Sequence, residues 1–448
     1  MGEAAVAYGD RLPHRPLSTI SLALDQWLWD GEPQGFKRTN LIIHLITTML
    51  VLLLARTLIQ RVHGHESHAF WPALAITAVW AVHPLLVSTV LYVVQRMEML
   101  AALFTVLAVL VYLSGRKRLE SGESGGWIRI CIAGLCSLLA LLSKENGALA
   151  PFLILAVELL LFRFATARPG AAQILKIGFS TLLVFAAVLY LFWLAPGAIS
   201  GNAFVRREFT WDERLLTQLR VLPMYIGWIL IPITDRYLFY YDHFEHSISI
   251  LKPMTTLFGA VFLSSLAAAV WLLKDRAPLV ALGIAWFFIA HALTSNLFSL
   301  ELVFEHRNYV AAFGILLALG AAIHQAGFVA AGRFAITVIM LLVVGLAALT
   351  SIRSATWGDP MNLALHHVEI NPQSDRAGLD LAGLYLGNDD WDPAATPFLN
   401  AAREQLERIA VLPKSRTVAD QALIVLAARL EEPTPEIAWR RLIHKVET

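Results

Sequence analysis

Residues 39–60 read TNLIIHLITTMLVLLLARTLIQ, a stretch in which long apolar side chains follow one another with few interruptions. About 20 mostly apolar residues in a helix are needed to cross the hydrocarbon core of a bilayer. A helix is also the form in which a single segment satisfies its own backbone hydrogen bonds in lipid. This stretch therefore predicts a membrane-spanning helix.

The composition agrees with that prediction over the whole chain. Its 448 residues are 57% hydrophobic and 15% charged, with a mean hydropathy of +0.61, which excludes an ordinary soluble domain. The net charge of +1, without a basic tract interleaved with aromatics, excludes nucleic acid as a partner. Cys131 and Cys136 lie in one apolar run and fit neither a disulfide nor a zinc site.

Similar stretches recur and predict an all-α polytopic bundle with about ten spans. Residues 213–232 are excluded from the spans because their first half is charged and prolines occur at 223 and 232. We expect that segment to lie at the interface or to re-enter the membrane. The expected spans are 39–60, 69–84, 98–114, 127–143, 148–163, 174–195, 255–273, 277–296, 309–325 and 334–352.

The loop charges predict the orientation, because short cytoplasmic loops collect Lys and Arg. Arg61, Arg116, Arg163, Lys274 and Arg333 all fall on one side if 213–232 does not cross, and that side is expected to be cytoplasmic. The opposite loops and the C-terminal region would then face the periplasm of a bacterial inner membrane. The bilayer itself is thus the first expected partner.

Two domains are expected. Residues 1–355 would form the membrane domain, and residues 356–448 a small soluble helical region. The apolar spacing in that region fits degenerate tetratricopeptide-type helix pairs or a plain helical appendage.

Polar groups gather at alternate ends of the expected spans, and hence at one membrane face. Ionisable groups at the edge of hydrocarbon are costly and point to function. The groups are His83-Pro84, Gln95-Arg96-Met97-Glu98, Ser143-Lys144-Glu145-Asn146-Gly147 and Glu305-His306-Arg307-Asn308-Tyr309.

The first two groups are expected to lie close together. Residues 85–94 are too short to cross the membrane again, so they should form a short helix along the outer surface and bring His83 near Glu98. We expect catalytic roles for both side chains. The alternatives are an interfacial helix cap for His83 and a structural ion pair between Arg96 and Glu98.

The other two groups suit binding of a phosphate. Lys144 and Glu145 lie in a short turn, where snorkelling explains the lysine better than the acid. Arg307 presents a planar fork suited to phosphate oxygens, with His306 beside it. Glu305 would orient Arg307 or abstract a proton.

Weaker candidates lie in the outer segment between 196 and 253. Asp242 is flanked by aromatic residues of the kind that stack on sugars, although interfacial aromatic belts have the same composition. Gln218 and Arg220 are further candidates. Glu158 is expected to be a packed residue, and no P-loop, dinucleotide fingerprint or zinc peptidase motif is present.

These motifs, together with Arg15-Pro16-Leu17-Ser18, Gly35-Phe36-Lys37 and Asn40-Leu41-Ile42-Ile43-His44, resemble the transmembrane and tetratricopeptide-repeat proteins. Those are GT-C glycosyltransferases, known as O-mannosyltransferases, with bacterial relatives. The resemblance covers residues 11–355 in matching order.

The resemblance implies a polyprenyl-phosphate-linked sugar as donor and a protein or glycan acceptor presented by the helical repeats. A carboxylate such as Glu98 would be the base, Arg96 and Lys144 would bind phosphate, and Arg307 would grip the lipid phosphate. No cofactor or metal ligand set is expected, and the need for a divalent metal stays open. The family has a further helix and an acidic pair upstream, so we expect a truncated start, or else Asp25, Asp30 or Glu98 as the replacement acid.

Two other functions stay open. The chain could be a polymerase or ligase of lipid-linked oligosaccharides, with a glycan as acceptor. It could also be a non-catalytic membrane scaffold whose helical region recruits partners. A transporter is disfavoured because its ionisable groups would lie near the bilayer midplane.

Overall fold

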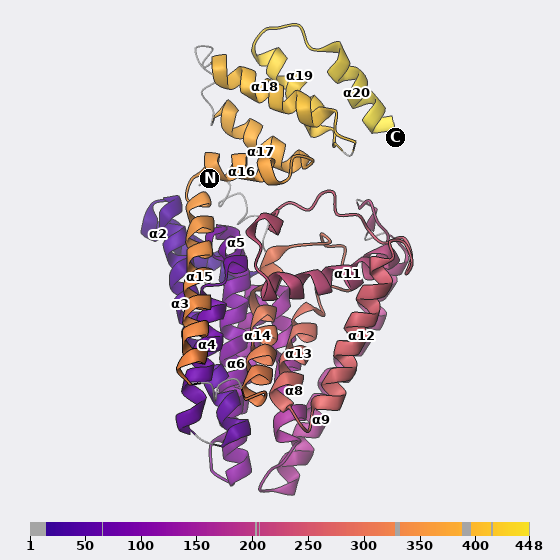
Figure 1. Ribbon diagram of the computed structural model, residues 1–448. Coiled ribbons are helices and arrows are strands. Elements are labelled where there is room, and N and C mark those ends of the chain that lie inside the picture. Colours follow the sequence, from indigo (N-terminus) through magenta and orange to yellow (C-terminus); the bar gives the residue numbers. More distant parts are fainter. Residues whose placement is uncertain are drawn as a thin grey trace. The chain divides into compact units, whose positions relative to one another are not determined.

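The fold is all-α, as the sequence predicts. The computed structural model describes residues 15–64, 66–201, 204–205, 207–327, 332–387, 396–413 and 415–447, and these residues contain no β-strand (Figure 1). The first fourteen residues were expected to belong to the membrane domain, and they lie outside the described part.

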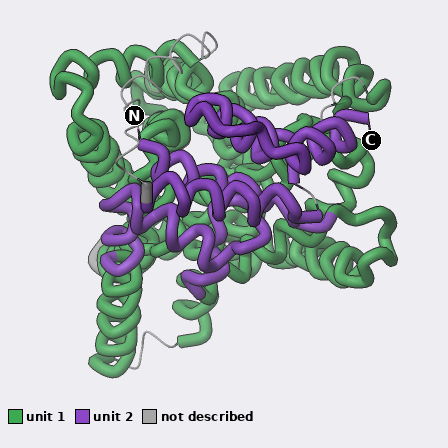
Figure 2. The backbone as a smooth tube through the Cα atoms, turned by 90° about the horizontal axis from the view of Figure 1, so that it is seen from above, with its two compact units in different colours: residues 1–232, 246–350 green, residues 233–245, 351–448 purple. Residues whose placement is uncertain are grey.

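The chain forms two compact units (Figure 2). Unit 1 comprises Met1–Pro232 and His246–Thr350, and unit 2 comprises Ile233–Glu245 and Ser351–Thr448. The second unit thus begins slightly before the boundary expected at 355, and it includes a segment that the sequence placed in the membrane domain.

Unit 1 is a helical bundle. In chain order its elements are α2 (Pro16–Trp29), α3 (Pro33–His63), α4 (Glu66–Ala81), η1 (Pro84–Leu86), α5 (Val87–Leu91), η2 (Val93–Gln95), α6 (Arg96–Ser121), α7 (Gly126–Ser143), η3 (Glu145–Leu149), α8 (Ala150–Val157), η4 (Glu158–Phe162), α9 (Pro169–Leu189), η5 (Tyr190–Leu194), α10 (Ala195–Ile199), α11 (Trp211–Leu230), α12 (Thr255–Leu273), α13 (Pro278–His291), η8 (Glu305–Arg307), α14 (Asn308–Gln325) and α15 (Arg333–Thr356), the last of which ends in unit 2.

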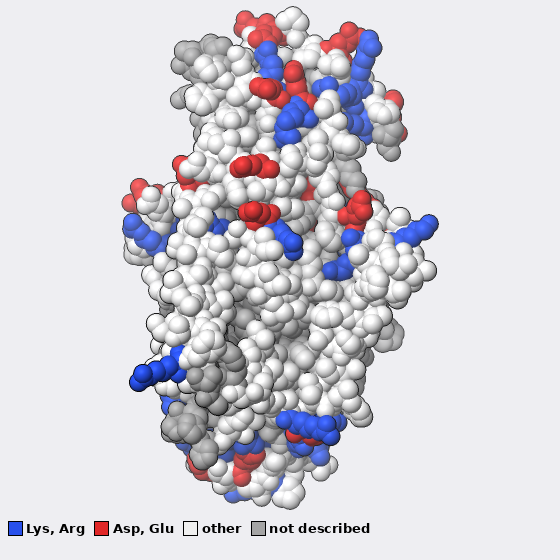
Figure 3. Space-filling view, viewed as in Figure 1, with Lys and Arg blue, Asp and Glu red and all other residues white. Residues whose placement is uncertain are grey.

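Eight helices in the described residues are long and apolar enough to cross a membrane, or nine if the bent pair Ala69–Ala81 and Pro84–Leu91 counts as one span. These nine match nine of the expected spans. The tenth, expected over 277–296, is the apolar helix α13, which at 14 residues is shorter than the others. On the visible face of unit 1, charged side chains gather at the two ends and leave a broad uncharged belt between them (Figure 3).

The segment after His83 is helical, as expected, and its side chains are buried in the bundle. The chain bends by 47° between α4 and the following helical turns. Leu85, Val87 and Thr89 are all buried, because α5 packs between α3, α6 and η8. Its place along the outer membrane surface stays a prediction, and its side chains are packed inside the bundle.

α11 covers most of the segment that the sequence excluded from the spans. It is one continuous helix, which begins with a capping box in which Thr210 and Glu213 bond to each other's backbone N–H. It is not among the helices that meet the criteria for a span, and it runs across the bundle rather than along it (Figure 1). Its charged first half explains this position, because Arg214 and its neighbours would be costly in lipid.

α6 is held near both ends by buried ion pairs. At its start, Arg96 pairs with Asp25 of α2 at 2.5 Å, and both side chains are buried. Near its end, Arg116 pairs with Glu158 at 2.6 Å, and the Tyr112 hydroxyl donates to the same carboxylate at 2.6 Å. Glu158 is thus a packed residue, as expected.

Unit 2 is a small helical body in which each helix packs against the next in sequence. Its core lies among the last four helices and includes Leu406, Ile409, Leu423 and Leu426. The helices are α16 (Pro360–Ile370), α17 (Asp375–Leu386), α18 (Thr396–Ala410), α19 (Val418–Arg429) and α20 (Glu436–Glu447).

Candidate active site

Side chains from three of the four polar groups surround one small cavity at one end of unit 1. Glu98 of α6, Asn146 of η3 and Arg307 of η8 line it, and Thr105 and apolar side chains complete the wall. The cavity has a volume of about 20 Å³, enough for about one water molecule. The structure thus brings together a carboxylate, an amide and a guanidinium that are distant in sequence.

Glu98 is held in place by two residues of the group at positions 143–147. Its carboxylate pairs with the Lys144 ammonium at 2.8 Å and also accepts from the Asn146 amide at 3.3 Å. Glu98 is 2% exposed and lies in the first turn of α6, where the helix dipole favours a negative charge. The Lys144 ammonium also donates to Gln95 at 3.5 Å.

A close approach of the backbone positions Lys144 and Asn146. Lys144 is in an extended conformation between α7 and η3, so the chain turns sharply after Ser143. A Cβ atom on Gly147 would lie only 2.1 Å from the carbonyl carbon of Ala140. Because position 147 has no side chain, η3 can fold back onto α7. This arrangement directs Lys144 and Asn146 to Glu98.

Glu145 faces the start of α2 rather than the cavity. It pairs with Arg15 at 2.7 Å, and about half of its side chain is exposed. Arg15 also contacts the sulfur of Met97. Exposed ion pairs of this kind contribute little to stability, so the pair mainly ties α2 to η3.

Arg96 has no donor left for a phosphate. Its guanidinium donates to the Asn40 amide at 2.7 Å, to the Phe36 carbonyl at 2.9 Å and to the Ser21 carbonyl at 3.0 Å, besides Asp25. It is fully buried. The geometry gives Arg96 a positioning role among α2, α3 and α6, which differs from the role expected for it.

The Glu305 group lies in a single turn, η8, before α14. Ser88 of α5 donates to the Glu305 carboxylate at 2.5 Å. His306 lies against Phe304, with ring centroids 4.8 Å apart, and within electrostatic range of Lys144 and Arg307.

Arg307 is held by backbone carbonyls. It donates to the carbonyls of Glu301 at 2.7 Å and Leu302 at 3.1 Å. It is 5% exposed, and within the described residues it forms no ion pair. A buried guanidinium without a carboxylate partner is a site for an anion.

Sequence reasoning missed Arg214, which lies beneath the same loop. It is fully buried and donates to the carbonyls of Thr294, Asn296 and Leu300. Burial, and after it the positive charge of Arg307, lower the pKa of the Arg214 guanidinium to about 9. Two cations thus lie close together, and neither has an acidic partner in the part of the chain that the structure describes.

Tyr225 and His291 were also missed. The Tyr225 hydroxyl accepts the backbone N–H of Phe304 at 2.8 Å, and the His291 ring stacks on Tyr225 with centroids 5.3 Å apart. Among the described residues the buried Nε2 of His291 has no hydrogen-bond partner. The only available signal was the position of these residues in segments flanking the Glu305 group.

Of the remaining candidates in unit 1, His83 and Gln218 bond to the backbone, whereas Arg220 bonds to a side chain. His83 bonds through Nε2 to the Ile229 carbonyl at 3.0 Å and through Nδ1 to the N–H of Leu85 at 3.2 Å, as a helix cap does. Gln218 donates to the Leu302 carbonyl at 3.0 Å. Arg220 donates to Ser247 at 3.5 Å.

Asp242 belongs to unit 2 and not to the body that contains the cavity. Its carboxylate pairs with Arg376 and accepts from the Ser374 hydroxyl at 2.5 Å. Within the described residues no group of three or more His, Cys, Asp or Glu is arranged to hold a metal ion.

Comparison with known proteins gives partial matches of low identity. The chain is 32% identical over 137 residues to Protein O-mannosyl-transferase Tmtc2 of Drosophila melanogaster, which covers 30% of this chain and 14% of that protein. It is 31% identical over 149 residues to Tmtc1 of the same organism, covering 33% and 16%. It is 27% identical over 189 residues to TMTC2 of Homo sapiens, covering 41% and 21%.

The chain thus spans between 14% and 21% of the length of these three relatives. All three are animal proteins, so they do not bear on the bacterial membrane expected from the sequence. No family model and no solved structure matches the chain.

Proposed function

We propose that this chain is a GT-C-type membrane glycosyltransferase that moves a sugar from a polyprenyl-phosphate-linked donor to a hydroxyl of a protein acceptor. The observation that carries the proposal is the cavity lined by both Glu98 and Arg307, with Lys144 bonded to Glu98. A base and an anion-binding cation around one space are the two groups that transfer from a phosphate requires.

The proposed step uses the two ends of this cavity. Glu98 takes the proton of the acceptor hydroxyl, and the oxygen forms a bond to the anomeric carbon of the sugar. The bond between that carbon and the phosphate oxygen breaks, and the phosphate leaves with the electron pair. Arg307 stabilises the negative charge that grows on the leaving phosphate. This route inverts the anomeric centre; a retaining route would need a covalent or ion-paired intermediate.

Lys144 has two possible acceptors in this scheme. In the absence of donor it neutralises Glu98, which offsets part of the cost of burying both charges. A phosphate entering the cavity offers a second anion to the same ammonium. The carboxylate would then be released from Lys144 and could accept the proton of the acceptor hydroxyl.

Arg214 supplies further positive charge without direct contact to the cavity lining. It fixes the carbonyls of residues 294–301, and the carbonyls of residues 301 and 302 in turn hold Arg307. Arg214 is therefore a positioning residue in this proposal.

The names of the relatives support a protein acceptor and mannose as the sugar. Unit 2, with its successive packed helices, would bind the acceptor as tetratricopeptide-type repeats do. A glycan acceptor remains the alternative within enzymes.

We place the cavity on the non-cytoplasmic side, which is the periplasmic face in a bacterial inner membrane. The support is the charge of the other end, where Arg61, Arg118 and Arg163 lie at or near helix ends. Positive residues of this kind mark cytoplasmic ends.

The test is transfer of label from a synthetic polyprenyl-phosphate mannose to acceptor protein by the purified chain in lipid nanodiscs. Arg307→Ala should lower transfer by at least about 100-fold, which is typical for loss of one stabilising group. Arg118→Ala is the matched control, because Arg118 lies near the far end of α6, where it contacts the exposed Glu123 and the Ser124 carbonyl.

The outcomes separate the alternatives. Label in protein supports the proposal, whereas a ladder of labelled glycan would show a polymerase or ligase. Equal transfer by wild type and Arg307→Ala would rule out the proposed site. If no label moves although the donor binds in a manner that depends on Arg307, the chain is a donor-binding scaffold.

A further inference from the structure

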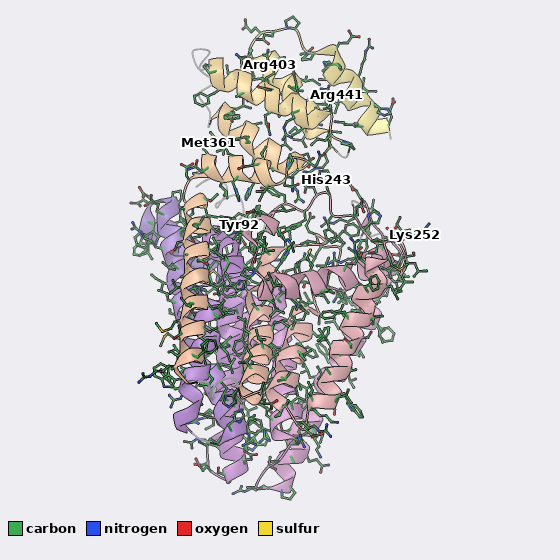
Figure 4. All side chains as sticks on the ribbon, viewed as in Figure 1. Tyr92, His243, Lys252, Met361, Arg403 and Arg441 are labelled. Carbon is green, nitrogen blue, oxygen red and sulfur yellow. The ribbon has the colours of Figure 1, made fainter. Side chains whose placement is uncertain are left out.

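Residues Tyr237–His243, here called the 237–243 segment, belong to unit 2 although they lie more than a hundred residues before its helices in the sequence. They come from the connection between α11 and α12 and have no regular secondary structure. Figure 4 labels His243 of this segment and Met361 of α16 within the same unit. What the segment does there is not explained by the proposed sugar transfer.

The aromatic end of the segment rests on side chains at and before α16. The Phe239 ring stacks on His367 of α16, with centroids 5.1 Å apart and planes 4° apart. Trp357 meets Phe239 edge-on at 5.3 Å. The guanidinium of Arg353 lies over the Tyr237 ring at 4.7 Å. His367 and Trp357 thus hold the Phe239 ring, and Arg353 holds the Tyr237 ring.

The polar end is bound by groups at the start of α17 and the turn before it. Asn371 donates to the backbone carbonyl of Tyr240 at 2.8 Å. Ser374 donates to the Asp242 carboxylate at 2.5 Å, and Arg376 pairs with the same carboxylate.

A side-chain hydroxyl completes this set of contacts. Tyr240 donates its hydroxyl proton to Asp380 of α17, and the guanidinium of Arg376 lies over the Tyr240 ring at 5.3 Å. A main-chain carbonyl, a carboxylate and aromatic rings are thus all recognised at fixed positions along an extended stretch. Recognition of this kind is typical of binding an extended peptide.

The helices of unit 2 do not need the segment to form their core. The core cluster consists of side chains from α17 to α20, such as Leu406, Leu423 and Ala438, and contains no residue of the 237–243 segment. The segment therefore lies outside the core of α17 to α20, against Trp357 and α16.

The backbone of the segment is also strained. Phe239 has φ +60°, a left-handed conformation that a bulky side chain rarely adopts. Backbone strain of this kind costs on the order of 1–3 kcal/mol. A free peptide that presents the same side chains without that strain would bind the same groups better.

We propose that the surface formed by Trp357, α16 and the start of α17 is a binding site for an extended polypeptide with an aromatic residue followed three positions later by a carboxylate. The chain's own Phe239 and Asp242 occupy this site in the present structure. A partner segment of the same chemistry replaces them. The proposal does not depend on sugar transfer, because it concerns recognition of a polypeptide alone.

Because the chain's own segment occupies the site, a partner must bind tightly enough to displace it. A segment tethered at both ends acts at an effective concentration of roughly millimolar or above. A peptide added in solution therefore competes poorly with the wild-type chain, and weakening the tethered segment should expose the site.

The experiment measures binding of a fluorescein-labelled peptide with the sequence LFYYDHFE, that of residues 238–245, to the full chain in detergent micelles. Fluorescence polarisation is compared between wild type and the double variant Phe239→Ala with Asp242→Ala. The double variant should bind the peptide at least about tenfold more tightly, because its own segment no longer competes.

Two controls test the recognised groups. Adding Asn371→Ala and Arg376→Ala to the double variant should abolish its gain in affinity for the peptide. A peptide with Asn in place of Asp should bind the double variant at least about tenfold more weakly than LFYYDHFE. The milder variant Asp242→Asn gives the same comparison, with a smaller gain, if the double variant does not fold.

The proposal is overturned if the variants that weaken the segment, and that fold as judged by thermal melting, bind the peptide no more tightly than wild type. It is also overturned if the gain survives the loss of Asn371 and Arg376. Either result would leave the proposed glycosyl transfer untouched, because its assay depends on Arg307 and Glu98.

Discussion

At the scale of single residues, the buried carboxylate of Glu98 is the group on which the proposed chemistry depends most. It is surrounded by one ammonium and one amide, and it shares its cavity with Arg307. A carboxylate in such a place is stable only because its charge is compensated. Lys144 and Asn146 thus fix the position of the carboxylate that the proposal uses as the base.

Glu98→Gln should lower the rate of transfer by roughly 10²–10⁴-fold, the usual contribution of a general base. The donor should bind at least as tightly as before, because Lys144 no longer has a carboxylate partner and remains free for the phosphate. Rates at saturating donor, together with the KM for the donor, separate these two effects.

Glu123→Gln is the matched control for this variant. Glu123 is exposed and pairs only loosely with Arg118, at 3.5 Å. Unchanged catalysis in Glu98→Gln would assign the role of base to a different acid.

The residues around the cavity show what a single sequence can and cannot predict. Glu98, Lys144 and Arg307 lie at alternate ends of apolar segments, so the alternation alone predicts that they face one end. The partner of Arg96 could not be predicted in this way, because Asp25 comes from a helix that the apolar pattern does not mark. Arg214 was missed because its role depends on the path of a loop eighty residues away.

At the scale of elements, the turn between α7 and α8 is where backbone geometry controls the site. Gly147 lies against the backbone of Ala140, and the two residues that hold Glu98 precede it directly. Any side chain at position 147 must push η3 away from α7.

Gly147→Ala should destabilise unit 1 by about 1–3 kcal/mol or more, as overpacking does, and should lower its melting temperature in detergent. Gly134→Ala, on α7, is the control, because a Cβ at position 134 meets nothing within 4 Å. Alanine is favoured over glycine in helices, so that variant should melt at the same temperature or higher. Equal melting of the two variants would contradict the close approach at Gly147.

The stacking of Phe239 on His367 should depend on pH. Burial, and then the charges of His366 and Arg353, lower the pKa of the His367 imidazole to about 4, while Phe239, Tyr240 and Trp357 surround it. The folded state therefore favours the neutral ring. Its stabilising contribution is fully present above pH 6.5 and is lost as the pH falls from 6.5 towards 4.

Hydrogen exchange of residues 237–243 should thus become faster between pH 7 and pH 5, after correction for the intrinsic pH dependence of exchange. The stabilisation lost at pH 5 is on the order of 2 kcal/mol. His367→Phe keeps an aromatic partner for Phe239 but cannot titrate, so the corrected exchange in that variant should not change. The same acceleration of hydrogen exchange in the wild type and in His367→Phe would mean that another titrating group is responsible.

At the scale of the whole molecule, the spans place the cavity and the positively charged helix ends on opposite sides of the membrane. Gln34 begins α3 near the Arg96 cluster, whereas Ser121 ends α6 on the other side. Both positions are exposed.

An impermeant maleimide should therefore label Gln34→Cys in intact cells and Ser121→Cys only after permeabilisation, in a chain whose two natural cysteines are replaced by alanine. The reverse pattern would place the cavity in the cytoplasm and exclude the proposed orientation.

The number of spans and their order follow from apolar length alone, because lipid imposes a minimum length on every crossing helix. Within the described residues, α13 falls below that length, and α4 reaches it only together with Pro84–Leu91. The division into units could not be predicted in the same way. The 237–243 segment joins unit 2 through Phe239, Asp242 and their partners more than a hundred residues away, and no periodic pattern marks such pairings.

The two ion pairs of α6 have a mechanical consequence. Arg96 and Arg116 are 20 residues apart, which corresponds to about 30 Å of helix. Each forms a buried ion pair, so α6 is fixed near both of its ends. Breaking either ion pair would cost several kcal/mol. α6 is thus the fixed side of the cavity that Glu98 lines. A cavity that holds one water must widen before a sugar enters, and the walls left to move are η3 with α8, α13, and η8 with α14.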